Sequence, residues 1–130
     1  MKTSLLILLS FFLFSCQHQV VEGKVKYEVS EDFVHGSEDI PLLLEMERVL
    51  ESSLGFDTES GSIIRSDYII SAGLEHAREF YIEILPQMGW SLENEIIEKI
   101  IFQRDNETLE IEFVNFNGED TVKFFLSSSL

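Results

Sequence analysis

The pattern of apolar and polar residues along the chain predicts several strands and one helix. Leu54 and Phe56 alternate with smaller or polar residues within 51–57, and β-branched isoleucines follow in 62–71. The segment between them ends in Gly61, which favours a tight turn. These two segments are therefore predicted to form a β-hairpin. Before them, residues 42–50 fit either a short helix or an extended segment, and periodicity alone leaves both open.

One amphipathic helix is predicted to follow this hairpin, over residues 72–85. At about 100° per residue, one side of this helix is apolar and the opposite side is mostly acidic. The apolar side comprises Leu74, Ala77, Tyr81, Ile84, Leu85 and Met88. Ser71 is a candidate N-cap, and Pro86 is expected to end the helix because it lacks an amide hydrogen. Trp90, the only tryptophan, is expected to begin the next strand as a core residue with its indole N–H bonded at the rim.

The C-terminal part of the chain alternates in the manner of strands throughout. Strands are predicted at residues 90–92, 98–104 and 108–116, and the Asn-Gly pair at 117–118 is the strongest hairpin signal in the chain. Residues 122–126 continue the alternation. The predicted fold is therefore an α+β domain: a single antiparallel sheet with one amphipathic helix packed on one face, in ββαβ order with further C-terminal strands.

The N-terminal apolar run predicts export from the cytoplasm. Residues 5–14 follow Lys2 and are too short to cross a hydrocarbon core of about 30 Å comfortably as a helix, which is typical of a signal peptide. The run ends in the letters LFSC at residues 13–16, which resembles the lipobox of bacterial lipoproteins. In that family the chain is cut before the cysteine, which carries acyl chains. The alternative is an ordinary secretory signal with a chance cysteine near its end.

The lipobox resemblance implies an anchor and a location. It implies that residues 1–15 are a signal peptide and that Cys16 is the lipidation site, so the protein would be held at the membrane by its lipid and would face the periplasm of the cell envelope. Gln17 stands where an aspartate retains many such lipoproteins at the inner membrane, which favours the outer membrane. Residues 16–39 are predicted to be an acidic tether with one possible edge strand at 24–29, and residues 40–130 the domain.

Charge and cysteine content exclude several function classes. The chain has 24 Asp and Glu against 9 Lys and Arg, and the chain without Lys2 would have a formal charge of −16. Such acidity argues against nucleic acid as a partner. It fits simple solubility and also attraction of a basic partner, with solubility the simpler interpretation. With its single cysteine lipidated, the chain has no thiol left for a disulfide, a nucleophile or a metal site.

The ionisable residues form no recognisable catalytic or metal motif. The three histidines lie apart, His18 near the predicted lipid, His35 in the tether and His76 on the polar side of the helix, and none belongs to a nucleophile or zinc motif. We therefore predict no catalytic residue, no cofactor and no metal. Glu110 and Glu112 share one strand face at a spacing that suits a cation, although a solvated sheet face is the simpler interpretation.

The domain itself carries a second resemblance. The resemblance lies in four segments of the domain, at residues 39–42, 51–57, 60–61 and 80–90. The last of these segments reads FYxxxLPQxGW. Together they resemble a family of small bacterial envelope proteins and lipoproteins of unknown function, over roughly residues 39–115. The chain departs from that family at 43–45 and at Ser62. The resemblance implies an envelope domain and brings no catalytic or binding residues.

These observations predict a membrane-anchored lipoprotein that acts as a non-enzymatic binding or assembly module in the cell envelope. Its partner would contact the helix-free sheet face or an edge strand, and an exposed apolar patch near Phe116, Phe124 and Phe125 would mark the contact. The alternative is an enzyme or small-ligand carrier whose site is not recognisable from sequence. The sequence leaves open the partner, the choice of membrane and the oligomeric state.

Overall fold

The structure, a computed structural model, describes residues 27–129, so the predicted signal peptide and Cys16 lie outside the described residues. The elements are β1 (Val29–Phe33), β2 (Pro41–Leu43), β3 (Met46–Thr58), β4 (Gly61–Ile70), α1 (Leu74–Gln87), β5 (Ser91–Ile96), β6 (Lys99–Arg104), β7 (Glu107–Phe116) and β8 (Glu119–Ser129). Within this part of the chain no helix has the length and apolar character needed to cross a bilayer. The described chain is therefore mostly β, with one helix.

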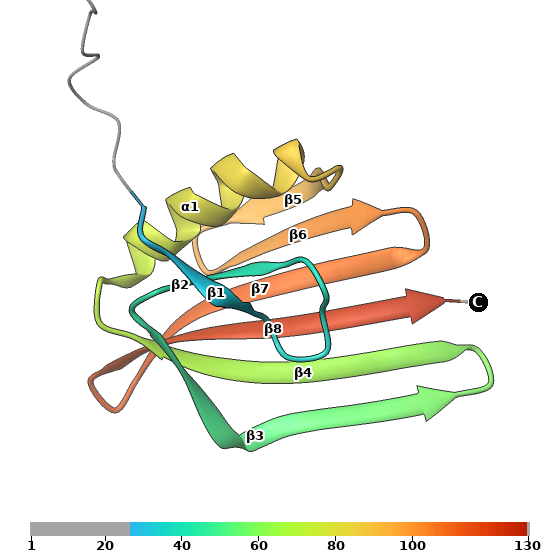
Figure 1. Cartoon of the computed structure of the whole chain (residues 1–130), viewed down its shortest axis with the longest axis horizontal. Helices are drawn as coiled ribbons and strands as arrows, with labels where there is room; N and C mark the ends of the chain where they lie inside the picture. The colour runs from blue at the N-terminus through green and yellow to red at the C-terminus, as the bar shows by residue number, and fades with distance from the viewer. Residues whose placement is uncertain (1–26, 130) are drawn as a thin grey trace, which may run out of the picture.

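The strands form two separate sheets. Six strands make the main sheet in the order β3-β4-β8-β7-β6-β5, and β1 pairs with β2 in a two-stranded sheet (Figure 1). All pairs are antiparallel. The predicted single sheet in ββαβ order is wrong, because four strands precede α1 and are divided between two sheets. Alternation indicates which residues form strands but not which strands pair with each other. Pro41 starts β2 opposite Phe33, at the first residue of a strand, where the missing amide hydrogen is tolerated.

The helix and the small sheet cover the same face of the main sheet, which we call the inner face. Tyr81 of α1 connects these layers: its ring centroid lies 5.4 Å from that of Phe124 in β8, and its hydroxyl donates a 2.8 Å hydrogen bond to the carbonyl oxygen of Pro41. Inward-facing strand residues complete the core, including Tyr68, Ile100, Phe102, Leu109, Ile111, Val122 and Phe124. The opposite face of the main sheet, which we call the open face, therefore lacks the cover that α1 and β1–β2 provide.

The N-terminal part of the described chain packs on the core. Residues 29–39, which the sequence analysis assigned to the tether, form β1 and the loop that follows it, and Val34 in this loop is buried. Residues 42–50, for which helix and extended structure were both open, form the end of β2, a turn at 44–45 and the start of β3. The hairpin β1–β2 therefore acts as a cover for the inner face.

The end of α1 explains the most distinctive part of the FYxxxLPQxGW segment. The helix begins after Gly73 rather than at Ser71 and continues through Pro86 into its last turn. It ends in a Schellman arrangement, in which the Trp90 N–H bonds to the Leu85 carbonyl oxygen at 3.1 Å and Gly89 has φ +89°. That dihedral favours glycine. The motif therefore specifies the corner between α1 and β5.

Candidate binding surface

Apolar side chains of β3 and β4 that are exposed, and one of β8 that is partly buried, gather at one end of the open face. Leu54 and Phe56 of β3 are 51% and 59% exposed, and Ile63 of β4 is 48% exposed. Phe56 lies opposite Ile63, and Leu54 lies opposite Arg65, which lies opposite Phe125. Directly opposed residues point to the same side of a sheet. We call Leu54, Phe56, Ile63 and Phe125 the open-face patch.

The centre of the open face is charged and contains two ion pairs. The Arg65 guanidinium lies 3.2 Å from the Asp67 carboxylate and 5.5 Å from the centroid of the Phe125 ring. Lys99 lies 2.8 Å from Glu110, and this hydrogen bond raises the pKa of Lys99. The patch therefore adjoins a region of neutralised charge, where apolar contact with a partner carries less desolvation cost than it would beside unpaired charges.

The acidic pair Glu110 and Glu112 is part of this paired region. Glu110 binds Lys99, and Glu112 lies opposite both Lys99 and Lys123 in the strand register. Residues 27–129 contain no group of three or more His, Cys, Asp or Glu that could hold a metal ion. Glu110 therefore forms a cross-strand ion pair with Lys99, and Glu112 faces two lysines across the sheet.

The patch only partly coincides with the predicted one. Phe116 is 66% exposed, but Phe124 is fully buried on the inner face, so its expected exposure is wrong. Phe116 pairs with Glu119 beside the β7–β8 turn, whereas Phe125 lies toward the other end of β8. Two adjacent phenylalanines on one strand necessarily point to opposite faces. The residues that accompany Phe125 come instead from β3 and β4, whose position the sequence alone did not indicate.

The outer edge of β3 is available for pairing. Among the described residues, β3 is an edge strand that pairs only with β4, and the residues after its irregularity between Val49 and Leu54 run regularly from Leu54 to Thr58. The turn after them is tight: a Cβ added to Gly61 would lie 1.8 Å from the Ser128 carbonyl oxygen. Gly61 therefore allows the start of β4 to lie close to β8 beside the patch.

On the inner face of the same end of the sheet lies a polar hollow of about 470 Å³. Its wall carries three carboxylates, those of Glu38, Asp39 and Glu107, and one guanidinium, that of Arg104. The hydroxyls of Ser62 and Ser128 lie 2.7 Å apart at its rim. We call this cavity the acidic hollow. Because its acids outnumber its single base, it favours cationic groups.

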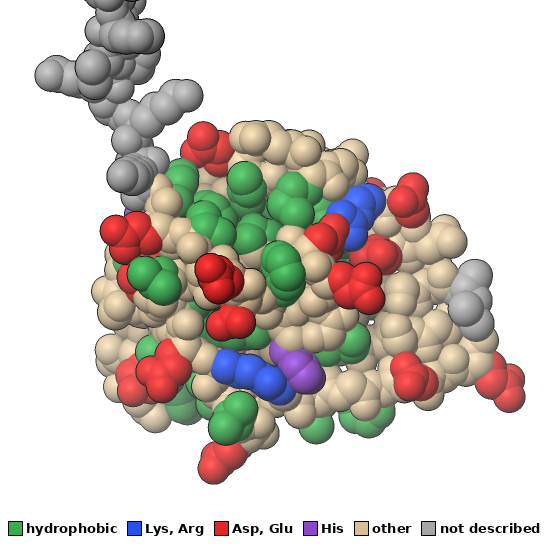
Figure 2. All heavy atoms as spheres, in the orientation of Figure 1, with side chains coloured by type: hydrophobic (Ala, Val, Ile, Leu, Met, Phe, Trp, Pro, Cys, Tyr) green, Lys and Arg blue, Asp and Glu red, His purple; other side chains and the backbone are tan. Residues whose placement is uncertain are grey.

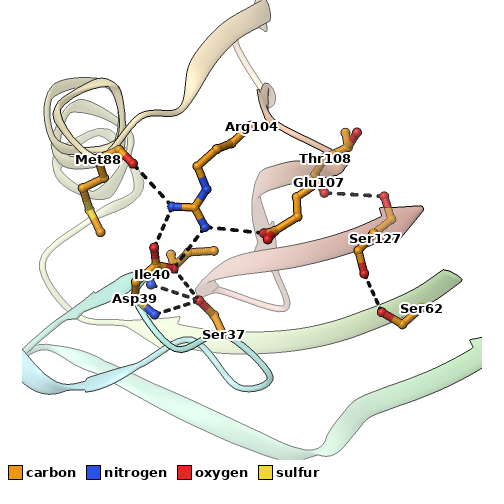
Figure 3. A network of polar contacts seen from close by, with 10 residues as sticks. Ser37, Asp39, Ile40, Ser62, Met88, Arg104, Glu107, Thr108 and Ser127 are labelled. Carbon is orange, nitrogen blue, oxygen red and sulfur yellow. Dashed lines mark hydrogen bonds and ion pairs between the residues drawn. The ribbon is translucent and has the colours of Figure 1, made fainter. Parts of the chain in front are cut away.

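Arg104 joins three parts of the chain beside the acidic hollow (Figure 3). Its guanidinium donates hydrogen bonds to Asp39 at 2.6 Å and to the Met88 carbonyl oxygen at 3.4 Å, and lies 3.5 Å from Glu107. It also stacks over Trp90, 4.2 Å from the ring centroid. The hydrogen bond from Arg104 lowers the pKa of Asp39. No sequence signal connected Arg104 with Asp39, because the pair depends on how the β1–β2 loop folds over the sheet.

The histidines and the tryptophan considered in the sequence analysis do not form a common site. His35 lines a separate shallow pocket beside Tyr68, and the His76 ring lies 5.1 Å from that of Tyr27, while His18 lies outside the described residues. Trp90 is buried, as predicted. Its indole nitrogen has no hydrogen-bond partner among the described residues, so the expected rim hydrogen bond is wrong. Neither histidine of the described chain lines the acidic hollow.

The molecular surface agrees with the acidic composition. Asp and Glu side chains are spread over the face shown in Figure 2, with few Lys or Arg side chains between them.

Comparison with protein-family models, with curated proteins and with solved structures returns no match for this chain. The lipobox and the envelope-family resemblance therefore remain predictions.

Proposed function

We propose that this protein is a lipid-anchored lipoprotein of the cell envelope and a non-enzymatic binding module, whose partner protein docks on the open-face patch at the β3 edge. The anchor would be Cys16, and the location the periplasmic side of a membrane, with the outer membrane favoured. The observation that carries the proposal is the cluster of exposed apolar side chains on and beside β3, an edge strand that pairs only with β4 within residues 27–129.

The energetics of the patch support docking. Leu54, Phe56 and Ile63 are each about half exposed, and burying the remaining half contributes roughly 1 kcal/mol per side chain. Soluble monomeric proteins rarely expose a contiguous group of such side chains unless the group marks a binding site. An edge strand adds backbone donors and acceptors that a partner strand would satisfy. The two contributions point to the same place on the molecule.

The anchor also fits the domain. Ten residues separate Cys16 from Tyr27, the first described residue, and a chain of that length reaches at most about 35 Å. A lipid on Cys16 would therefore keep the domain within a few tens of ångströms of the membrane surface, where envelope proteins are its neighbours. Two or three acyl chains provide a stable anchor, whereas one gives only marginal binding.

The anchor is tested by intact mass and membrane fractionation of the full chain. The wild type is expected to start at Cys16, to carry the mass of its acyl chains and to sediment with membranes. Cys16→Ser, which preserves the size of the side chain, is expected to remain in the soluble fraction without added mass. A wild-type protein that is cleaved elsewhere and stays soluble would refute the anchor.

The docking surface is tested by photocrosslinking in native cells. A photoreactive amino acid replaces Phe56 in the patch, and in the control it replaces Asn94, an exposed residue of β5 at the opposite edge of the sheet. Position 56 is expected to yield a discrete crosslinked species that position 94 does not. Equal labelling from both positions, or labelling from position 94 alone, would contradict docking at the patch.

The alternative function, an enzyme or small-ligand carrier, would use the acidic hollow. Its volume suits a small molecule, but its polar groups already bond to one another: Arg104 with Asp39, and Ser62 with Ser128. The lining residues include no histidine to act as a base for either serine. A mutation in the hollow that abolished a measured turnover, with the patch intact, would favour this alternative.

A further inference from the structure

The two sides of the β3 edge differ in chemistry, and this difference specifies the partner. A strand added to this edge would point alternate side chains to the open face and to the inner face. On the open face they would meet Leu54 and Phe56. On the inner face they would meet Asp57, which lies opposite Ser62 at the rim of the acidic hollow.

Gly55 indicates that another backbone can approach here. It lies between the two apolar residues of the patch, within a strand, where glycine costs stability. A Cβ at this position would meet nothing within 4 Å, and Gly55 is not among the glycines with positive φ. Packing and backbone conformation among the described residues therefore give no reason for a glycine. Close approach of a second strand is a recognised reason for glycine in a strand.

The charge around the edge is strongly acidic. Between residues 45 and 61 the chain has five acidic residues and one basic residue, Arg48. Glu51, Asp57 and Glu59 are exposed, and the Arg48 guanidinium bonds to Ser53. The acidic hollow adds three carboxylates on the inner side. A basic side chain on the inner side of an added strand would therefore be attracted by several carboxylates.

We propose that the partner is an extended polypeptide segment in which apolar and basic residues alternate, and that it adds to the outer edge of β3 as a seventh strand of the main sheet. Its apolar side chains lie on the open-face patch, and its Lys or Arg side chains lie on the inner side toward Asp57 and the acidic hollow. This inference rests on the proposed function, because it specifies the partner of the same patch.

A second copy of this chain fits the edge less well. Pairing two β3 edges would bring Glu51, Asp57 and Glu59 of one copy close to the same residues of the other. Like charges across neighbouring strands are destabilising, and the whole chain has a formal charge of −15. A basic segment would instead be attracted to each of these acidic residues.

The test measures binding of synthetic peptides to the full chain. The chain is purified from cells and held in nanodiscs of phosphatidylcholine, which has no net charge, and empty nanodiscs measure peptide binding to lipid. Three labelled peptides of about eight residues, a common strand length, are compared by fluorescence anisotropy. One alternates Ile or Phe with Lys, the second has Glu in place of Lys, and the third has the Lys composition with its apolar residues in one block.

The alternating Lys peptide is expected to bind at least about tenfold more tightly than the other two, and its affinity is expected to fall as salt rises. If the Glu peptide binds equally well, docking on the patch stands and the preference for a basic partner is wrong. If the block peptide binds equally well, strand addition is wrong. If no peptide binds better than to empty nanodiscs, or if the chain instead dimerises through β3, the inference is overturned.

Two substitutions separate this inference from the proposed function. Phe56→Ser is expected to weaken every peptide that binds the patch, because it removes apolar contact. Asp57→Lys is expected to weaken only the Lys peptide, by about tenfold, and to favour the Glu peptide. Glu75→Lys, an equal charge change on an exposed residue of α1, is expected to change neither. An equal effect of Asp57→Lys and Glu75→Lys would show that only net charge matters.

Discussion

The two edges of the main sheet, β3 and β5, are protected to very different extents. β5 has six residues, an irregularity between Leu92 and Asn94, and two glutamates, Glu93 and Glu95. Short length, irregular pairing and charge all discourage edge-to-edge association. β3 has 13 residues and ends in a regular segment that carries Leu54 and Phe56. β3 also carries acidic residues and an irregularity between Val49 and Leu54, so the two edges differ in length and in the regular segment from Leu54 to Thr58.

Side chains from other elements strengthen the β5 edge further. Arg78 of α1 bonds to the Glu95 carboxylate at 2.9 Å and to the carbonyl oxygen of Ile96 at 3.1 Å, which occupies a backbone acceptor of β5. At the start of β5, Arg104 stacks on Trp90. Among the described residues, the segment from Leu54 to Thr58 receives no comparable contact from α1 or the small sheet. Contacts from other elements therefore protect the β5 edge, whereas the end of β3 remains accessible to a partner strand.

The largest effect is expected from Gly61→Ala, which displaces the unprotected edge. The new Cβ would lie 1.8 Å from the Ser128 backbone oxygen, so the β3–β4 turn must shift, at a cost of about 3 kcal/mol in the free energy of unfolding. Gly118→Ala is the matched control, because that turn glycine also has positive φ but its Cβ would meet nothing within 4 Å. It should lose only about 1 kcal/mol. Denaturant titrations measure both, and equal losses would show that contact with Ser128 is unimportant.

A smaller effect is expected from Asp39→Asn, which weakens the contacts of Arg104 near the β5 edge. Loss of the ion pair should cost about 1 kcal/mol at neutral pH, a modest value because the Asp39 side chain is 44% exposed. Glu107→Gln is the control and should cost less, since Glu107 lies 3.5 Å from Arg104 rather than 2.6 Å. A greater loss for Glu107→Gln would contradict the assigned order of the two contacts.

The same pair gives a pH dependence with a defined sign. The hydrogen bond from Arg104 holds the pKa of Asp39 below its ordinary value, so the unfolded chain binds the proton more readily than the folded chain. The stabilisation is therefore fully present above the ordinary pKa of about 4 and is lost as the pH falls through the lower folded value. Unfolding measured between about pH 6 and pH 3 should show a steeper loss for wild type than for Asp39→Asn. Equal slopes would contradict the shift.

The smallest effect is expected from Arg78→Ala, which removes protection from β5. The loss of stability should be about 0.5 kcal/mol, because the Glu95 partner is largely exposed. Amide hydrogen exchange should become faster in β5, while the rates in residues 54–58 of β3 stay unchanged. Arg78→Lys retains the charge but not the paired donors, so it should give an intermediate result. Faster exchange in both edges would show that Arg78 acts on the whole sheet.

The local elements of this fold could be predicted from the sequence. Alternation and the residues 58–61 indicated the β3–β4 hairpin, the Asn-Gly pair indicated the turn between β7 and β8, and the residues around Pro86 indicated where α1 ends. The helix was displaced by two residues at each end, from 72–85 to Leu74–Gln87. These features depend on neighbouring residues and on turn chemistry, which a single sequence contains in full.

The tertiary structure alone decided which surfaces are covered. Alternation assigns Phe124 and Phe125 to opposite faces but does not say which face receives α1 and the small sheet. The division into two sheets, the pairing of Asp39 with Arg104, and the meeting of Leu54 with Ile63 and Phe125 all depend on contacts between residues far apart in the chain. Such contacts follow from how whole elements share one apolar core, and a local pattern carries no record of that choice.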